Sequence, residues 1–375
     1  MNQAYKIGLA LAAWALASIP SAQAWACGGG GVTSQVGVTM NSQRVFMSVR
    51  ASGKTDIIAQ ITVPQTTAAY GVLIPVPAEP TLDSEPVSAA DLNLLDILTA
   101  PVITSESYDS GGSGCGCIGS GAAGGDKSKG PSGGVTVSSA VTIGPVEAVS
   151  LTGESGDAVR AWLTDNGFSL AQTDTATLDR YVGAGKYFIA IRRTENATTS
   201  GPSSIGVHYA LSGDHRMLSL GFTRIGAAEQ LALTLFLAAP QTVGPSDPFK
   251  ALTLGDLDAA TLRRDDYPQA VRNAVAARDS KAFVLESSTP LEGVASSIPS
   301  LARFMDENAT ITRATTVLAR EKINDDAIFA TPFKGTVPSQ RRVSLDAARI
   351  RYASMGSLAL LLVAGALRRR SRGRP

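Results

Sequence analysis

The sequence predicts an α+β protein with largely antiparallel sheets, a few packed helices and one C-terminal transmembrane helix. Three observations lead to this prediction. Apolar runs of strand length, interrupted by turn residues, recur through most of the chain. Apolar residues at helical spacing occur in short segments, of which residues 156–168 and 175–185 are the clearest. An uncharged, mostly apolar segment at residues 352–367 is followed by a run of arginines.

Residues 25–77 are expected to form strands. The apolar runs VFMSVR and IIAQITV have strand length and are separated by turn residues 51–54. Pro75 and Pro77 are expected to leave the sheet, because proline cannot donate a hydrogen bond to a neighbouring strand. Two further strands are expected at residues 35–40 and 70–74.

The first helix of the body is expected after Ser88. Serine is a good N-cap, and Asp91 stands at the capping-box position three residues later. Pro101 closes the segment, since proline cannot continue a helix. One apolar stripe is formed by Leu92, Leu95 and Leu98.

The stretch of residues 141–239 is expected to be the centre of the fold. Residues 141–151 are read as one strand, because apolar side chains fall mainly on odd positions. Ser155 is placed to cap the first of two helices that follow. Apolar runs of strand length come next, interrupted by residues 212–214 and by Gly226, as hairpins require.

Beyond this stretch the chain is expected to alternate short helices and strands. Pro268 and Pro299 are each placed to open a helix, since proline is favoured in the first turn. Strands are expected at residues 281–286 and 310–319.

Composition and charge are those of an ordinary globular protein. The chain has 375 residues, 44% of them hydrophobic, and a formal net charge of +1. Its basic residues are spread out except at the C-terminus, and they do not alternate with aromatic residues. Because the electrostatic footprint of a nucleic-acid-binding protein is missing, we expect no nucleic-acid partner.

The N-terminus has the features of an export signal. A lysine near the start precedes the apolar run at residues 7–19, and Ala22 and Ala24 form an A-x-A cleavage site. We expect cleavage after Ala24, so that residues 1–24 are a signal peptide and residues 25–336 are the exported α+β domain. The alternative is an uncleaved anchor, although the apolar run is short for a membrane span.

The C-terminal segment is expected to hold the protein in a membrane. Residues 352–367 would make about 24 Å of helix at roughly 1.5 Å per residue. Residues 368–375 are basic and would lie in the cytoplasm, with residues 337–351 as a polar stalk and the body on the periplasmic or extracellular side of the inner membrane. Two alternatives are a sorting signal that a processing enzyme removes and a buried amphipathic helix.

Residues 109–134 are the most biased segment of the chain. Their glycine and serine content cannot bury enough apolar surface to offset the entropy of ordering, which predicts a flexible loop. A phosphate-binding role is not expected, because the segment lacks the strand–GxxxxGK[ST]–helix context.

Several stretches together resemble a bacterial secreted family known as domain of unknown function 2330. These are Cys27 with the glycines after it, residues 70–77 (YGVLIPVP), residues 92–101 (LNLLDILTAP), residues 161–168 (AWLTDNGF), Tyr181-Val182, residues 187–191 (YFIAI), residues 311–313 (ITR) and residues 325–329 (DDAIF). The resemblance runs from Cys27 to Phe329, and the glycine-rich loop with its CGC motif is longer than the family pattern. It implies an exported, often membrane-anchored protein and brings no catalytic residues.

The three cysteines, Cys27, Cys115 and Cys117, allow two interpretations. In an oxidising compartment a disulfide is the first expectation, with Cys27 paired to Cys115 or to Cys117 and one thiol left over. The alternative is a thiol-redox or metal site on Cys115 and Cys117, because two neighbouring thiols can exchange disulfides or chelate soft metals.

His208 and His215 are the two histidines of the chain. They flank residues 212–214, so a hairpin there would let them approach and recruit a metal with Asp214. A structural role is the common alternative for histidines on strands. No G-x-S-x-G elbow stands before a helix, and paired-carboxylate catalysis stays open because acidic residues are scattered along the chain.

The sequence therefore predicts an exported, membrane-anchored bacterial envelope protein with a structural or binding role and no cofactor. The alternative is an envelope thiol-redox or metal-binding protein that uses Cys115 and Cys117. A protein or another envelope component is the expected kind of partner.

Overall fold

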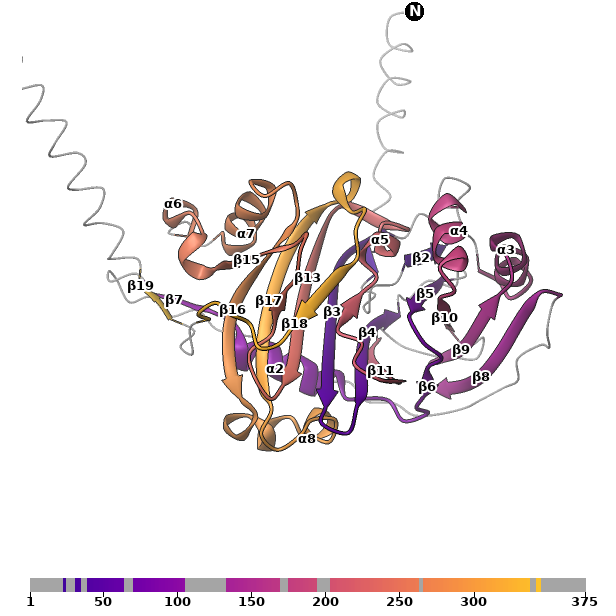
Figure 1. Cartoon of the computed structure of the whole chain (residues 1–375), viewed down its shortest axis with the longest axis horizontal. Helices are drawn as coiled ribbons and strands as arrows, with labels where there is room; N and C mark the ends of the chain where they lie inside the picture. Colours follow the sequence, from indigo (N-terminus) through magenta and orange to yellow (C-terminus); the bar gives the residue numbers. More distant parts are fainter. Residues whose placement is uncertain are drawn as a thin grey trace, which may run out of the picture.

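The fold is built on two sheets that share one hydrophobic core (Figure 1). The computed structural model describes residues 23–24, 31–34, 39–63, 70–104, 133–168, 175–193, 203–262, 266–337 and 342–344. Within them, the larger sheet has nine strands and the second sheet has five, and the helices are short. The α+β class with largely antiparallel sheets is thereby confirmed.

The nine-stranded sheet has the order β15-β16-β17-β13-β3-β4-β11-β6, with β1 paired to β3 outside this path. Most neighbours are antiparallel, and three pairs are parallel: β13 with β3, β15 with β16, and β1 with β3. Its strands are β1 (Gln23–Ala24), β3 (Thr39–Arg50), β4 (Lys54–Val63), β6 (Thr81–Leu82), β11 (Ser203–Ser212), β13 (Ala227–Ala239), β15 (Lys250–Thr253), β16 (Ala282–Pro290) and β17 (Thr310–Ala319).

The five-stranded sheet is antiparallel throughout and has the order β2-β5-β10-β9-β8. Its strands are β2 (Gly31–Ser34), β5 (Tyr70–Val76), β8 (Val135–Ile143), β9 (Val146–Gly153) and β10 (Tyr187–Arg193). Two smaller sheets join β12 (Met217–Leu218), β18 (Ala327–Ala330) and β14 (Gly244–Pro245), and β7 (Val102–Thr104) with β19 (Arg342–Ser344). Three residues of the expected polar stalk are thus paired with β7.

The helices are distributed over several faces of the sheets (Figure 1), and Val271 of the helix Tyr267–Ala276 packs into the core that the two sheets share. They are α2 (Ala89–Thr99), α3 (Gly156–Asp165), α4 (Thr175–Gly183), α5 (Leu220–Thr223), α6 (Ala259–Leu262), α7 (Tyr267–Ala276) and α8 (Pro299–Ala302). Single 3-10 turns occur at Leu254–Asp256, Leu291–Gly293, Ala295–Ser297 and Arg320–Lys322.

The central strands are buried on both faces, so alternate residues point into different cores. Val45 of β3 belongs to the core shared with the five-stranded sheet, whereas Phe46 belongs to the core under α2 and α8. The five-stranded sheet repeats this division: Ile189 faces the nine-stranded sheet, and Phe188 packs with Trp162 under α3 and α4. These layers are therefore α2 with α8, the nine-stranded sheet, the five-stranded sheet, and α3 with α4, whereas α7 packs on the nine-stranded sheet from the side of the shared core.

The expected helix starts are confirmed. Ser88 Oγ accepts a hydrogen bond from Asp91 N (3.4 Å) and Ser155 Oγ accepts one from Ala158 N (3.2 Å). Asp91 does not complete a capping box. Its carboxylate instead accepts from Ser300 N (2.8 Å) and Ser300 Oγ (2.7 Å), which ties α2 to the start of α8.

Two sequence-based expectations in the five-stranded sheet were wrong. Residues 141–151 are not one strand, because Gly144 (φ +55°) and the next residue turn the chain between β8 and β9. Pro75 does not leave the sheet: it lies in β5 opposite Phe188. Within the described residues β2 ends opposite Leu73, so β5 is paired on only one side at Pro75, where proline is tolerated.

The expected hairpin across residues 212–214 is also absent from the described structure. After β11 the chain leaves the nine-stranded sheet, and β12 pairs with β18 instead. Leu218, Leu220 and Phe222 are all buried, but they belong to the short strand β12 and the helix α5 rather than to one long strand.

No helix among the described residues is long and apolar enough to cross a membrane. The segment expected to do so, residues 352–367, lies outside the described residues. The expected transmembrane helix therefore stays a prediction.

Candidate binding groove

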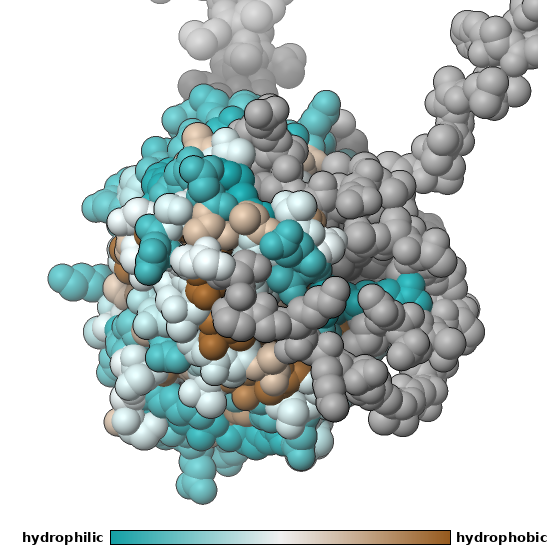
Figure 2. Space-filling model, turned by 90° about the vertical axis from the view of Figure 1, so that its right-hand side faces the viewer, coloured by the Kyte–Doolittle hydropathy of each residue, from teal (hydrophilic) through white to brown (hydrophobic). Residues whose placement is uncertain are grey.

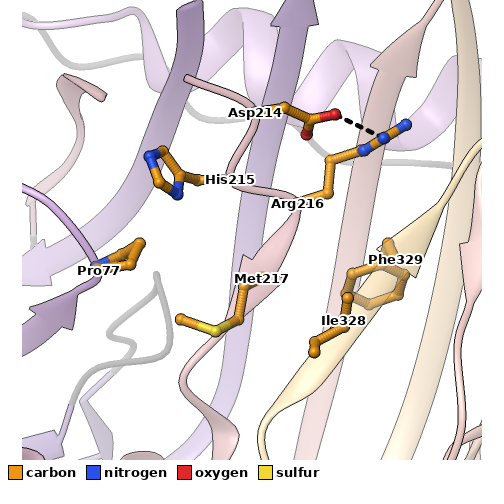
Figure 3. Close-up of a pocket in the computed structure, with 7 residues that line it drawn as sticks. All are labelled: Pro77, Asp214, His215, Arg216, Met217, Ile328 and Phe329. Carbon is orange, nitrogen blue, oxygen red and sulfur yellow. Dashed lines mark hydrogen bonds and ion pairs between the residues drawn. The ribbon is translucent and has the colours of Figure 1, made fainter. Parts of the chain in front are cut away.

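A groove with a volume of 340 Å³ opens where three distant segments of the chain meet (Figure 3). Pro77 follows β5, residues 214–216 connect β11 to Met217 of β12, and Ile328 with Phe329 belongs to β18. The residues that line it are Pro77, Asp214, His215, Arg216, Met217, Ile328 and Phe329.

Thr55 and the β12–β18 pair fix the geometry of the groove. Gly213 has a φ of +103°, which turns the chain away from β11. Thr55 Oγ1 donates to Gly213 O (2.7 Å) and accepts from His215 N (2.9 Å), so one hydroxyl holds both sides of the turn. Met217 then pairs directly with Ile328, which places the two side chains next to each other.

One side of the groove is apolar. Ile328 is 51% exposed, although Ala327 and Phe329 on either side of it are buried. This alternation along β18 points Ile328 outward, where Figure 3 shows it near Met217, with Pro77 across the groove. An exposed isoleucine beside a further apolar side chain, with a third across the groove, is the kind of surface that ligands cover.

The other side of the groove is polar. Arg216 Nη2 donates to Asp214 Oδ2 (2.6 Å), and His215 Nε2 lies 2.8 Å from Ser212 O (Figure 3 shows the ion pair). Arg216 Nε is buried and has no hydrogen-bond partner within the described part of the chain. A buried N–H without a partner costs free energy.

His208 lies outside the groove, in a buried cluster of charges. Its Nε2 is 2.9 Å from Asp56 Oδ1, and its Nδ1 is 3.3 Å from Asp83 Oδ2. The ring of Phe304 stacks on the imidazole, with 4.1 Å between ring centroids. Arg50 Nε also lies 2.6 Å from Asp56 Oδ2, so the fully buried Asp56 has cationic neighbours.

Asp56 stays ionised in this cluster. Burial alone would raise the pKa of Asp56, but the hydrogen bonds from His208 and Lys54 and the charge of Arg50 together hold it below its usual value. Because this cluster joins β4, β11 and the segment after α8, we interpret it as a structural element rather than a reaction centre.

A second buried cluster crosses the edge of the nine-stranded sheet. The guanidinium of Arg313 on β17 binds both Glu286 on β16 and Asp96 on α2. The Tyr267 hydroxyl donates to Glu286, and Arg44 Nη2 donates to Asp96 Oδ2 (2.9 Å). These contacts connect α7, the sheet and α2, which again indicates a structural role.

The structure does not bring the expected metal ligands together. His208 is buried beside Asp56, whereas His215 lies in the groove and faces Ser212 O. Among the described residues no group of three or more His, Cys, Asp or Glu side chains could hold a metal ion. Cys27, Cys115 and Cys117 lie outside these residues, so the disulfide, redox and metal interpretations of the cysteines stay predictions.

The sequence analysis singled out Asp214 and His215, which line the groove, but only as candidate metal ligands and without the other lining residues. Pro77 and Ile328 are far apart in the chain, and neither belongs to a motif with known chemistry. Asp56 and Arg313 were missed for the same reason: each acts through partners on strands that are distant in sequence.

A family model described as "Uncharacterized protein conserved in bacteria (DUF2330)" matches residues 21–248, which is more than half of the chain. The matched residues include Pro77 and residues 214–217 of the groove, whereas β18 lies beyond them. The late motifs at residues 311–313 and 325–329 also fall outside the match. No curated protein and no solved structure matches the chain.

Proposed function

Because the chain belongs to the bacterial family described as "Uncharacterized protein conserved in bacteria (DUF2330)", we propose that it is an exported, membrane-anchored envelope protein that binds a ligand in the groove between Pro77, His215 and Ile328. Export and membrane anchoring are supported by the sequence of residues 1–24 and of residues 352–375. The binding role is supported by the groove.

The observation that carries the binding role is the exposure of Ile328. An isoleucine side chain gains about 1.5–3 kcal/mol from full burial, and Ile328 is left 51% exposed beside Met217. A ligand that covers it recovers part of this free energy. Grooves of this kind hold a ligand by apolar contact and orient it through a few polar groups.

The ligand class follows from the two sides of the groove. An apolar group would lie against Pro77, Met217 and Ile328, and a hydrogen-bond acceptor would meet the partly exposed guanidinium of Arg216, which Asp214 holds beside it. An extended segment of another envelope protein would supply both groups. One of its side chains is the apolar group, and a backbone carbonyl beside that side chain is the hydrogen-bond acceptor.

Site-specific photo-crosslinking in the native envelope tests the groove. The full-length chain would carry p-benzoylphenylalanine at position 328 or at position 217. We expect an adduct of the same mass from both positions, because Met217 and Ile328 are paired across β12 and β18. Position 97 on α2 is the matched control, since Ile97 is also an exposed isoleucine (68%) but lies elsewhere. An absence of adducts at 328 and 217, or the same adduct from all three positions, would contradict a binding role for the groove.

Intact-mass measurement separately tests whether the signal peptide is cleaved and the C-terminal anchor is kept. A mature chain isolated from the envelope should begin at Trp25 and end at Pro375 if the signal is removed and the anchor is kept. A mass that still includes residues 1–24, or one that lacks the C-terminal segment, would contradict this form of anchoring. Alkylation before the measurement counts the free thiols, of which a single disulfide leaves one.

A further inference from the structure

Two exposed aliphatic side chains lie close together along the chain where α2 leads into β7. Ile97 on α2 is 68% exposed, and Val102, the first residue of β7, is 43% exposed. Among the large hydrophobic residues of the described chain, the one other exposed side chain is Ile328, which belongs to the groove. Figure 1 shows β7 at the left-hand end of the molecule. Neighbouring exposed aliphatic residues indicate a surface that another component covers.

The exposed face of α2 contains no charged residue. Its exposed positions are Ala90, Asn93 and Ile97, which follow one another at helical spacing. The two acidic residues of the helix, Asp91 and Asp96, are half-buried and bind other parts of the body. Because burial of a charge is costly, an uncharged face can leave water at a smaller cost than a charged one.

The C-terminal end of α2 is fixed to the nine-stranded sheet. Arg313 Nη1 donates to Asp96 O (3.1 Å), and Ser287 Oγ donates to Thr99 O (3.0 Å). These bonds satisfy two of the carbonyl groups that a helix leaves without partners at its end. The exposed face around Ile97 is therefore held in place by the body of the protein, which favours contact with a surface because little further ordering is needed.

The course of the chain indicates what covers this surface. The strand β19 pairs in parallel with β7, with Arg342 opposite Val102. Residues 345–351 then lead to residues 352–367, the segment expected to cross a membrane. A connection of that length spans at most about 25 Å, even when it is fully extended. An anchor in the membrane would therefore hold the α2–β7 end of the body close to the bilayer.

The charge of the sequence that includes β19 suits an anionic bilayer. Residues 341–351 contain four arginines and one acidic residue, Asp346. Arginines next to a membrane are attracted to anionic lipid headgroups and draw the adjoining protein toward the surface. Aliphatic side chains on that protein then gain free energy by entering the boundary between headgroups and acyl chains.

We propose that the exposed face of α2 and the start of β7 form a membrane-contact surface, with Ile97 and Val102 against the headgroup region of the bilayer that holds the C-terminal anchor. This inference rests on the membrane anchoring proposed above and adds an orientation to it. The helix α3, at the opposite end of the molecule in Figure 1, would face the solution. Figure 2 views that opposite end and shows hydrophilic residues, in teal, above and below a central area of white and brown ones.

Fluorescence quenching in vesicles tests this surface. The full-length chain is reconstituted in vesicles of phosphatidylethanolamine and phosphatidylglycerol, with a fluorescent amino acid at position 97 or at position 102. A nitroxide near the top of the lipid acyl chains should quench both positions and should leave position 161 unquenched, because Ala161 is exposed on α3. Flotation of the same vesicles tests the anchor. A chain that does not float would overturn the anchor and the surface together. A chain that floats without quenching at positions 97 and 102 would overturn the surface alone and assign it to a protein partner.

Acidic substitutions test the same surface independently. Ala90→Glu together with Ile97→Glu places negative charges on the exposed face of α2 and should abolish the quenching at position 102. Both side chains are exposed, so the body should keep its fold, which circular dichroism would verify. Ala161→Glu together with Thr164→Glu, at exposed positions of α3, is the matched control and should leave the quenching unchanged. Quenching at position 102 that survives the α2 substitutions, or that is lost equally in the control, would overturn the proposal.

Discussion

Asp56 Oδ1 and His208 Nε2 lie 2.9 Å apart on the neighbouring strands β4 and β11, and both side chains are buried. His208 stands directly opposite Ile58, two positions along β4 from Asp56. Asp56 and His208 therefore form a diagonal pair on one face of the sheet. Phe304 closes the cluster from the segment after α8. The pair therefore links the end of the nine-stranded sheet to the α8 region.

Asp56→Asn should lower the free energy of unfolding by roughly 3 kcal/mol, because removal of one buried charge leaves its partners without compensation. Urea unfolding would measure the change. Asp83→Asn is the matched control: Asp83 contacts the other nitrogen of His208, but its side chain is 33% exposed. Its effect should stay below about 1 kcal/mol. Equal effects of the two substitutions would contradict the structural role of Asp56.

The ionisation of Asp56 should also make the free energy of unfolding depend on pH in the acid range. The pKa of Asp56 is lower in the folded chain than its ordinary value. The stability that ionised Asp56 contributes is therefore fully present above the unfolded-state pKa of about 3.9. This stability is lost as the pH falls through the lowered folded-state pKa. The free energy of unfolding should fall less between pH 5 and pH 3 (roughly the range of carboxyl titration) in Asp56→Asn than in the parent chain. Parallel pH profiles would contradict this assignment.

Arg313→Met should be among the most destabilising substitutions of a charged residue. Glu286 is fully buried, and Arg313 binds both it and Asp96. Loss of the guanidinium should cost about 3–5 kcal/mol, and the double variant Arg313→Met with Glu286→Gln should recover part of it.

Lys281→Met is the control for this ion-pair prediction. Lys281 Nζ lies 2.7 Å from Asp325 Oδ2, in a pair of which both side chains are partly exposed. The substitution should change the free energy of unfolding by less than about 1 kcal/mol. If the double variant is no more stable than Arg313→Met alone, the isolated charge of Glu286 is not the cause of the loss.

Gly206→Ala should destabilise the chain by about 1–3 kcal/mol through overpacking. A Cβ at Gly206 would lie 2.8 Å from Val87 Cβ and 2.9 Å from Ile58 Cγ2, both of them buried. At Gly183, in contrast, no heavy atom lies within 4 Å of an added Cβ. Gly183→Ala should therefore be neutral or stabilise by up to about 1 kcal/mol. Thermal unfolding of both variants checks the contrast, and equal losses would refute it.

Three buried tyrosines should resist ionisation at alkaline pH. Burial raises the pKa of Tyr181, Tyr209 and Tyr267, and the nearby carboxylates of Asp326 and Glu286 raise the pKa of Tyr181 and Tyr267 further. In the unfolded chain they titrate near pH 10, as ordinary tyrosines do. Their contribution to stability is therefore complete below about pH 10 and is lost as the pH rises above it.

Absorbance at the tyrosinate band would test this prediction. Of the eight tyrosines of the chain, these three should ionise only together with unfolding, which circular dichroism would follow in the same samples. Tyr181→Phe should reduce the late step by one tyrosine. Ionisation of all tyrosines before any loss of structure would contradict their burial.

Local sequence patterns predicted many individual elements correctly. The strand expected at residues 310–319 is β17, and the helix expected at Pro268 is α7, where Asp266 accepts a hydrogen bond from Gln269 N (3.1 Å). These features depend on side-chain alternation and on caps, which involve residues only a few positions apart. The same local patterns failed at Gly144, because apolar residues continue on both sides of the turn.

The sequence by itself determined the α+β class, the family, and most strands and helices, and it is the source of the predicted export signal and membrane anchor. Only the tertiary structure decided that Met217 meets Ile328 and that Asp56 meets His208. The physical reason is that periodicity fixes which face of a strand is buried, whereas pairing between distant strands depends on packing of the whole chain. The groove and the buried charges belong to that second kind of information.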